Sequence, residues 1–164
     1  TWPFVGMKGE LLEGGIRVPL LVRWPTVIAA GRRSDQVAIS MDWLPTLVAA
    51  AGRDTDPAYP SDGMSLLPVL EGGSTLVSRT LFWRHRANDQ AAVRDGQWKY
   101  LKLGGKEALF DLSEDERERA NLKDREPERF AALKARFAAW NATMLPYPAQ
   151  SYSEDVRNHA IDRY

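Results

Sequence analysis

One lysine in a glycine-rich opening segment is the side chain best suited to chemistry. Lys8 lies between Gly6 and Gly9, so a permissive backbone on both sides is able to present its ammonium group to a pocket. A compact positive charge of this kind stabilises sulfate or phosphate oxygens and the charge that develops on a leaving group. The segment therefore predicts an oxyanion contact at Lys8. The competing interpretation is a solvent-exposed lysine in a structural turn.

The residues that follow Lys8 are expected to shape this loop. The adjacent Gly14 and Gly15 indicate either a backbone bend with unusual φ or the close approach of another group. Glu13 and Arg17 carry opposite charges four residues apart, so we expect them to pair and to hold the loop. All four residues are therefore predicted to have structural roles around the lysine.

Other polar residues offer weaker candidates for a site. His85, in an aromatic segment, is able to donate a hydrogen bond to a substrate oxygen or a leaving group, and a structural or exposed histidine is the competing interpretation. Asp42 is expected to cap a helix, with a metal ligand as the alternative. The acidic run at 114–118 lacks the ligand spacing and central glycine of a calcium loop, so a solvated turn is expected there.

The first third of the chain predicts one strand and one helix. The apolar run at 19–25 is bounded by prolines, as is typical of a strand buried on both faces of a parallel sheet. Few nearby segments share that character, so the strand is expected to join a larger sheet. A helix is expected to begin at Asp42, with Pro45 in its first turn, and to end at Gly52. Its expected apolar face comprises Leu44, Leu47, Val48 and Ala51.

Beyond a loop at 53–61, the pattern changes to short aromatic and aliphatic segments. Four of them occupy residues 80–86, 90–94, 97–103 and 107–112, with turn residues such as Asp95-Gly96 between them. Segments this close leave no room for crossover helices, so an antiparallel meander is expected. A helix at 127–143 is expected to pack on the meander through a stripe of Phe130, Leu133, Phe137, Trp140 and Met144.

Five motifs in order, between residues 8 and 145, resemble those of the sulfatase family. The opening KGELLEGGIRVP, followed by LLVRWP, is similar to the family segment K-G-x-x-x-E-G-G-x-R-V-P and its buried strand. DWLPTL at 42–47 resembles D-x-x-P-T-L, and DGMSLLP at 62–68 resembles D-G-x-S-L-x-P. AVRDGQWKY at 92–100 resembles A-V-R-x-G-x-W-K-Y, and ALFDL with ERANL, within 108–122, resembles E-L-Y-D-L…E-x-x-N-L.

The resemblance implies a reaction as well as a fold. In the family, the lysine that matches Lys8 contacts the substrate sulfate, a formylglycine made from Cys or Ser in C/S-x-P-S/A-R is the nucleophile, and a calcium ion positions the sulfate. The sequence contains no C/S-x-P-x-R pattern, so nucleophile and calcium ligands are expected upstream of Thr1. The resemblance thus predicts a sulfate ester hydrolase as the intact enzyme, calcium bound there and not by this chain, and a chain that is inert alone.

The expected fold class is α/β, with an α+β C-terminal part. Residues 1–55 are predicted to be the tail of an alkaline-phosphatase-like catalytic domain, with the lysine loop, one sheet strand and one helix. Residues 60–148 are predicted to be a small subdomain in which a C-terminal helix packs on a four-stranded antiparallel sheet, and 149–164 a peripheral tail. The unpaired strand predicts homo-oligomers or strand exchange in the isolated chain.

The amino-acid composition argues against two classes of binding partner, nucleic acids and membranes. Lysine plus arginine equal aspartate plus glutamate at 22 each, so no global field favours nucleic acid. No apolar run approaches the ~20 residues needed to cross a bilayer. A sulfated small molecule or glycan is the expected substrate, and periplasmic, secreted and cytoplasmic locations are all compatible with the sequence. Two alternatives stay open: a phospho- or phosphonate-ester hydrolase of the same superfamily, and a non-catalytic module for binding or assembly.

Overall fold

The computed structural model describes residues 2–73 and 76–147, which fall into two compact units. One unit joins Thr1–Pro19 to the chain from Ser78 onward, and the other is Leu20–Val77. Residues 1–19 therefore fold with the C-terminal sheet, so the units of this chain do not divide at the predicted boundary near residue 55. The assignment of residues 1–55 to the catalytic domain of a longer protein stays a prediction.

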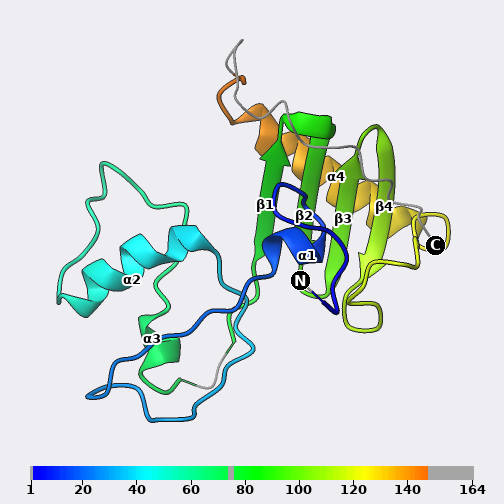
Figure 1. Cartoon of the computed structure of the whole chain (residues 1–164). Coiled ribbons are helices and arrows are strands. Elements are labelled where there is room, and N and C mark those ends of the chain that lie inside the picture. The colour runs from blue at the N-terminus through cyan, green and yellow to red at the C-terminus, as the bar shows by residue number, and fades with distance from the viewer. Residues whose placement is uncertain (1, 74–75, 148–164) are drawn as a thin grey trace. The chain divides into compact units, whose positions relative to one another are not determined.

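The first unit is built on a four-stranded antiparallel sheet. Its strands are β1 (Thr80–His85), β2 (Gln90–Asp95), β3 (Trp98–Leu103) and β4 (Lys106–Asp111), in the order β1-β2-β3-β4 (Figure 1). The last hairpin turns at Gly104 and Gly105, whose φ values of 57° and 83° are those that a type I′ turn requires at both positions. The predicted meander is confirmed.

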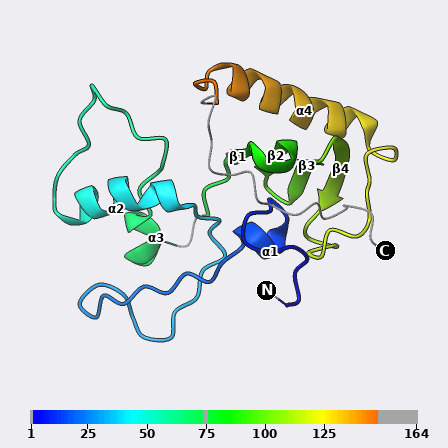
Figure 2. The same ribbon diagram turned by 45° about the horizontal axis from the view of Figure 1, so that its top comes forward.

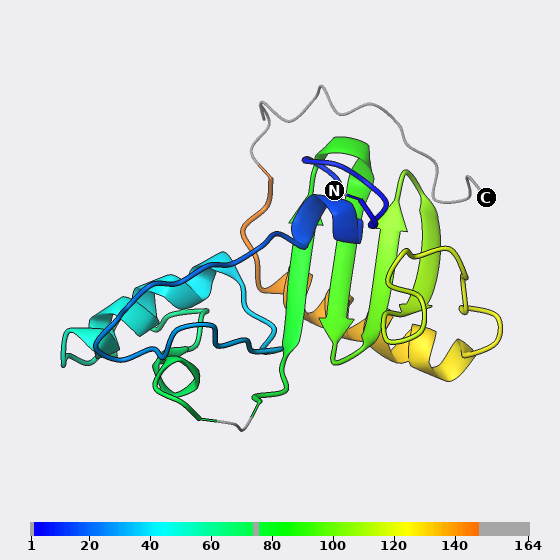
Figure 3. The same ribbon diagram turned by 60° about the horizontal axis from the view of Figure 1, so that its bottom comes forward.

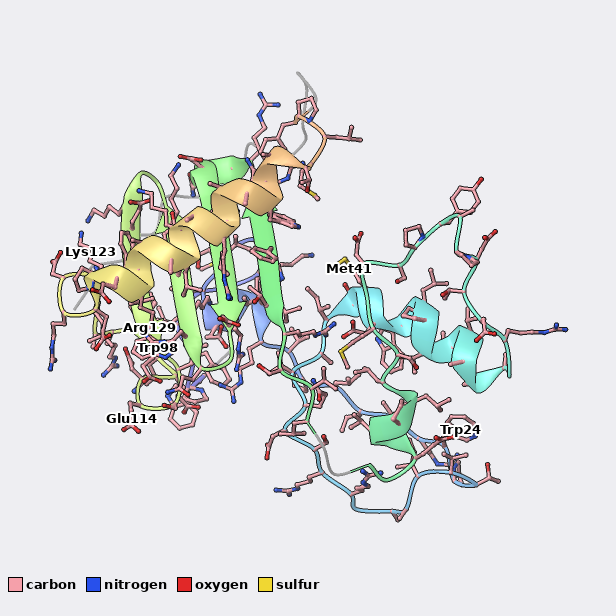
Figure 4. All side chains as sticks on the ribbon, turned by 180° about the vertical axis from the view of Figure 1, so that it is seen from behind. Trp24, Met41, Trp98, Glu114, Lys123 and Arg129 are labelled. Carbon is pink, nitrogen blue, oxygen red and sulfur yellow. The ribbon has the colours of Figure 1, made fainter. Side chains whose placement is uncertain are left out.

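Helix α4 (Pro127–Ala142) covers one face of this sheet (Figure 2). Leu133 is buried against side chains of β2, β3 and β4, and Phe82 stacks on Trp140 with ring centroids 5.1 Å apart. Seen from behind, Arg129 of α4 lies beside Trp98, with its guanidinium carbon 4.2 Å from the ring centroid (Figure 4). The predicted helix is confirmed, and so is the packing of four residues of its stripe on the meander: Phe130, Leu133, Phe137 and Trp140. Met144, the fifth, lies beyond the end of α4.

The opposite face of the sheet is covered by the N-terminal segment and α1 (Glu13–Ile16) (Figure 3). Leu11 and Leu12 are buried there in one cluster with sheet residues that include Leu101 and Phe110. Successive side chains of a strand point to opposite faces, so β2, β3 and β4 bury residues on both sides. The segment that carries Lys8 thus contributes Leu11 and Leu12 to the hydrophobic core of the sheet.

The predicted strand at 19–25 is not formed among the described residues. This run has no regular structure, and Leu21 is 94% exposed. A strand requires hydrogen-bonded neighbours, and the sheet of the described chain consists of β1 to β4 alone. The apolar composition of the run predicts that it is buried in a sheet. Among the described residues no strand pairs with it, so such burial would require a strand from elsewhere.

The second unit contains α2 (Trp43–Ala50), preceded by a 3₁₀ turn at Ser40–Asp42, and α3 (Leu67–Leu70). Gly52 ends α2 with φ 69°, as predicted. The predicted apolar face is wrong for this chain, because Leu44 and Leu47 are more than 60% exposed. Helical periodicity alone does not show whether a face is buried.

Asp42 does not cap α2, which corrects the prediction. Its fully buried carboxylate accepts hydrogen bonds from the backbone N–H groups of Ile39 (2.8 Å) and Met64 (3.0 Å). The Thr46 hydroxyl likewise accepts from the N–H of Leu66 at 2.8 Å. These two residues of the D-x-x-P-T-L motif therefore fix the D-G-x-S-L-x-P segment to the start of the helix.

Replacement of Asp42 by alanine is expected to lower the free energy of unfolding by about 2 kcal/mol, because two backbone donors lose a charged acceptor. Urea denaturation followed by circular dichroism would measure the loss. The exposed Asp62→Ala is the matched control and is expected to change stability by less than about 0.5 kcal/mol. Equal effects of the two substitutions would contradict this role for Asp42.

Candidate functional site

Lys8 stands on a tight turn that presents its side chain to solvent. The flanking Gly6 and Gly9 have φ values of 93° and 95°, where L-residues with a side chain are strained. The turn is closed by the N–H of Glu10, which donates to the carbonyl of Met7 at 3.0 Å, and by the N–H of Met7, which donates to the Glu10 carboxylate at 2.9 Å. Lys8 itself is exposed and has no hydrogen bond or ion pair with any described residue.

Gly14 and Gly15 are required by close approach, which was one of the two predicted reasons. A Cβ atom on Gly14 would lie 2.4 Å from the carbonyl oxygen of Val5, and one on Gly15 would lie 2.0 Å from that of Glu10. The N–H of Gly14 donates to the same Val5 oxygen at 2.7 Å. Neither glycine has a positive φ, so the alternative of unusual φ is wrong. The pair lets α1 lie directly against the lysine turn.

The predicted Glu13–Arg17 ion pair is not formed. Arg17 instead lies 3.6 Å from Glu116 and over the ring of Phe4, on the exposed side of α1. Glu13 points the other way and is 1% exposed. One turn of helix places residues four apart on one side, but α1 ends at Ile16, so Arg17 leaves the helix before the pair can form.

Glu13 instead belongs to a buried charge cluster that the sequence did not reveal. The Nζ atom of Lys99 lies 2.8 Å from Glu13 Oε1 and 2.7 Å from Glu118 Oε1, and all three side chains are at most 1% exposed. Arg94 approaches Glu13 Oε2 at 3.7 Å, so two cations face two carboxylates. Buried charges require such compensation. The cluster ties the lysine segment to the sheet.

Glu118 corrects the prediction of a solvated turn at 114–118. Its carboxylate accepts a hydrogen bond from the N–H of Glu13 at 2.6 Å, and its backbone has a φ of 55°. Burial raises the pKa of Glu118, against the opposing effects of Lys99 and of the Glu13 N–H. The charges of the cluster come from three different family-like motifs, and the partners lie 86 and 105 residues apart, so no local spacing could have signalled the contact.

Gln90 makes a second connection between the sheet and the lysine turn. Its side chain accepts a hydrogen bond from the N–H of Leu11 and donates one to the carbonyl of Gly9, both at 2.9 Å. His85 faces Gln90 across the β1–β2 pair, with its Nδ1 atom 3.3 Å from Gln90 Nε2. The predicted His85 thus contacts the side chain that is hydrogen-bonded to the turn carrying Lys8. Gln90 was missed because a single glutamine at the start of a strand has no distinctive pattern.

The sequence also led to expectations about a bound metal ion and about membrane-spanning segments. Among the described residues, no three His, Asp or Glu side chains are grouped so that they could hold a metal ion. The expectation that calcium ligands lie upstream stays a prediction. No helix in the described part of the chain has the length and hydrophobicity to span a membrane.

Comparisons with known proteins identify the chain as the C-terminal part of a sulfatase of the alkaline-phosphatase-like fold. The crystal structure of Ps i-CgsB, also solved with k-i-k-neocarrahexaose, matches with a TM-score of 0.75 and 28% identity over 85% of this chain and 32% of that one. The phosphonate monoester hydrolase of Agrobacterium radiobacter shares the fold alone, with a TM-score of 0.50 and 24% identity over 71% of this chain and 27% of that one.

Residues 7–140 match the family model described as N-sulphoglucosamine sulphohydrolase, C-terminal, and the chain belongs to this family. Arylsulfatase A of Bos taurus is 35% identical over 158 residues, which cover 77% of this chain and 31% of that protein. The chain therefore spans about a third of the length of this relative. The sulfatase resemblance of its motifs is confirmed.

Proposed function

We propose that this chain is the C-terminal part of an enzyme that hydrolyses sulfate esters, and that Lys8 binds the sulfate group. The observation that carries the proposal is an exposed lysine, without a partner among the described residues, on a turn held by buried polar contacts. Lysines that serve only solubility do not require such a support. Membership of a sulfatase family supplies the chemistry of the ligand.

In this proposal, the ammonium group of Lys8 stabilises the sulfate oxygens and the bridging oxygen as the S–O bond to the leaving group breaks. A formylglycine hydrate would supply the attacking oxygen and a calcium ion would neutralise sulfate charge, both held by residues outside this chain. The chain alone is therefore expected to be inert. His85 is proposed as a second substrate contact, because it contacts Gln90, whose side chain is hydrogen-bonded to the lysine turn.

Lys8→Ala in the intact protein is expected to lower kcat/KM for para-nitrophenyl sulfate by about 10²–10³-fold, the usual effect of losing one group that stabilises a developing oxyanion. Steady-state kinetics would measure the change. Lys106→Ala is the matched control, since Lys106 is also exposed and follows a glycine in a turn of the same unit. Equal activity of the Lys8 variant and the control would refute the role of Lys8.

A phosphonate monoester hydrolase shares the fold, so hydrolysis of phosphonate esters is the alternative activity to test. The same kinetic comparison with a para-nitrophenyl phosphonate ester separates the two activities. A sulfatase is expected to prefer the sulfate ester. A preference for the phosphonate ester would favour the alternative and leave Lys8 as the oxyanion contact.

The substrate class proposed for the intact enzyme is a sulfated glycan. The support is the similar structure solved in complex with k-i-k-neocarrahexaose, an oligosaccharide. Release of inorganic sulfate from sulfated oligosaccharides, compared with that from aryl sulfates, tests the proposal. A clear preference for aryl sulfates would instead indicate a sulfated small molecule.

A further inference from the structure

Gln90 is a buried amide whose contacts converge on the lysine turn. It is 2% exposed and stands at the start of β2. Besides its bonds to Leu11 and Gly9, its Nε2 atom donates to the carbonyl of Ala87 at 3.1 Å, in the connection before the strand. One side chain therefore links the sheet to the backbone on the C-terminal side of Lys8.

The chemistry of its partners fixes the orientation of the amide. The backbone N–H of Leu11 can only donate, so the Oε1 atom must face it. The carbonyls of Gly9 and Ala87 can only accept, so the Nε2 atom must face them. A flipped amide would oppose donor to donor and acceptor to acceptor. Nε2 carries two hydrogens, which these two carbonyls accept, and His85 Nδ1, 3.3 Å from Nε2, is a third and more distant neighbour of the same atom.

These bonds decide where the lysine turn stands on the sheet. Gly9 and Leu11 follow Lys8 by one and three residues, and both are held by the same side chain. Burial of Leu11 and Leu12 anchors the segment without direction, since the hydrophobic effect is not directional. Hydrogen bonds weaken steeply with angle and distance. They therefore supply the precision that apolar packing lacks.

We propose that Gln90 is a positioning residue that sets the place of the Lys8 ammonium group in the active site. The proposal rests on the proposed function of Lys8. Gln90 does not touch the substrate in this account. It acts through the backbone at Gly9 and Leu11, and its loss displaces the cation from the sulfate oxygens.

A double-mutant cycle in the intact protein separates positioning from folding. Gln90→Met keeps a similar length and removes both hydrogen-bonding groups. It is expected to lower kcat/KM for para-nitrophenyl sulfate by about 10²-fold, the cost of misplacing a catalytic group by ~1 Å. In the Lys8→Ala background the same substitution is expected to change kcat/KM by less than about threefold, because no cation remains to be misplaced. The exposed Gln97→Met is the control and is expected to have no effect.

The outcomes distinguish the two proposals. If Lys8→Ala has no effect, the proposed function fails. If Lys8→Ala reduces activity and Gln90→Met acts equally in both backgrounds, Gln90 has a structural role alone and the positioning proposal is overturned. Hydrogen–deuterium exchange of the unmodified protein gives an answer even if the variant does not fold. The Leu11 amide is expected to be protected from exchange by its hydrogen bond to Gln90. Exchange at the rate of an exposed amide would overturn the positioning proposal.

Discussion

Lys99→Met is expected to lower the free energy of unfolding by about 3–5 kcal/mol, the cost of leaving buried charges without their partner. Lys99 is fully buried between Glu13 and Glu118, and Arg94, at 3.7 Å from Glu13, is the remaining cation. Methionine fills a similar volume, so the loss reports the charge and not a cavity. Urea denaturation at neutral pH would measure it.

The Lys99→Met variant is also expected to recover stability on acidification. Burial already raises the pKa of Glu118, and Lys99 opposes that shift, so removal of Lys99 raises the pKa further. Between the ordinary glutamate value of about 4.3 and this raised pKa, the folded state binds the additional proton. Stability then falls as pH rises through this window and increases as pH falls through it.

Two comparisons test the assignment of this loss to buried charge. Lys102→Met removes a half-buried lysine that pairs with Asp89 at the surface, and it is expected to cost less than about 1 kcal/mol. Adding Glu13→Gln and Glu118→Gln to Lys99→Met is expected to restore most of the lost stability, because neither fully buried side chain then carries a charge and Arg94 is partly exposed to solvent. Failure of the triple variant to recover would show that packing, rather than charge, holds the cluster.

Gly15→Ala is expected to destabilise the protein by about 3 kcal/mol, at the upper end of the usual cost of overpacking. The added Cβ atom would lie 2.0 Å from the carbonyl oxygen of Glu10 and 2.5 Å from that of Met7. Both atoms are backbone of the lysine turn and cannot rotate away, so the turn must move from α1. Thermal unfolding would show the loss, and the turn should lose protection from hydrogen exchange.

Gly96→Ala is the matched control for this glycine. Gly96 has a φ of 59°, and a Cβ atom added there would have no neighbouring atom within 4 Å, so alanine meets strain but no clash. A left-handed alanine costs roughly 1–2 kcal/mol. A loss at Gly15 no larger than that at Gly96 would contradict the close approach of the Glu10 and Met7 carbonyls as the reason for this glycine.

Local patterns were sufficient to predict much of the first unit. The four strands follow from short aromatic and aliphatic segments separated by residues such as Gly96, Gly104 and Gly105, whose turn conformations depend on their own chemistry. Helix α4 follows from a repeat of apolar residues within one segment. The sulfatase motifs likewise lie in contiguous sequence. These features depend on neighbours along the chain, so the sequence by itself determined them, together with Lys8 as the candidate site.

The tertiary structure alone decided what supports that site. Glu13 meets Lys99 across 86 residues, Glu118 meets Glu13 across 105, and Gln90 meets Leu11 across 79. No periodicity encodes such pairs, because a buried charge or amide has the same letter as an exposed one. The run at 19–25 shows the converse, since a strand exists only when its hydrogen-bonding neighbours are present. Sequence identified the lysine, and folding supplied the buried polar contacts that fix its place.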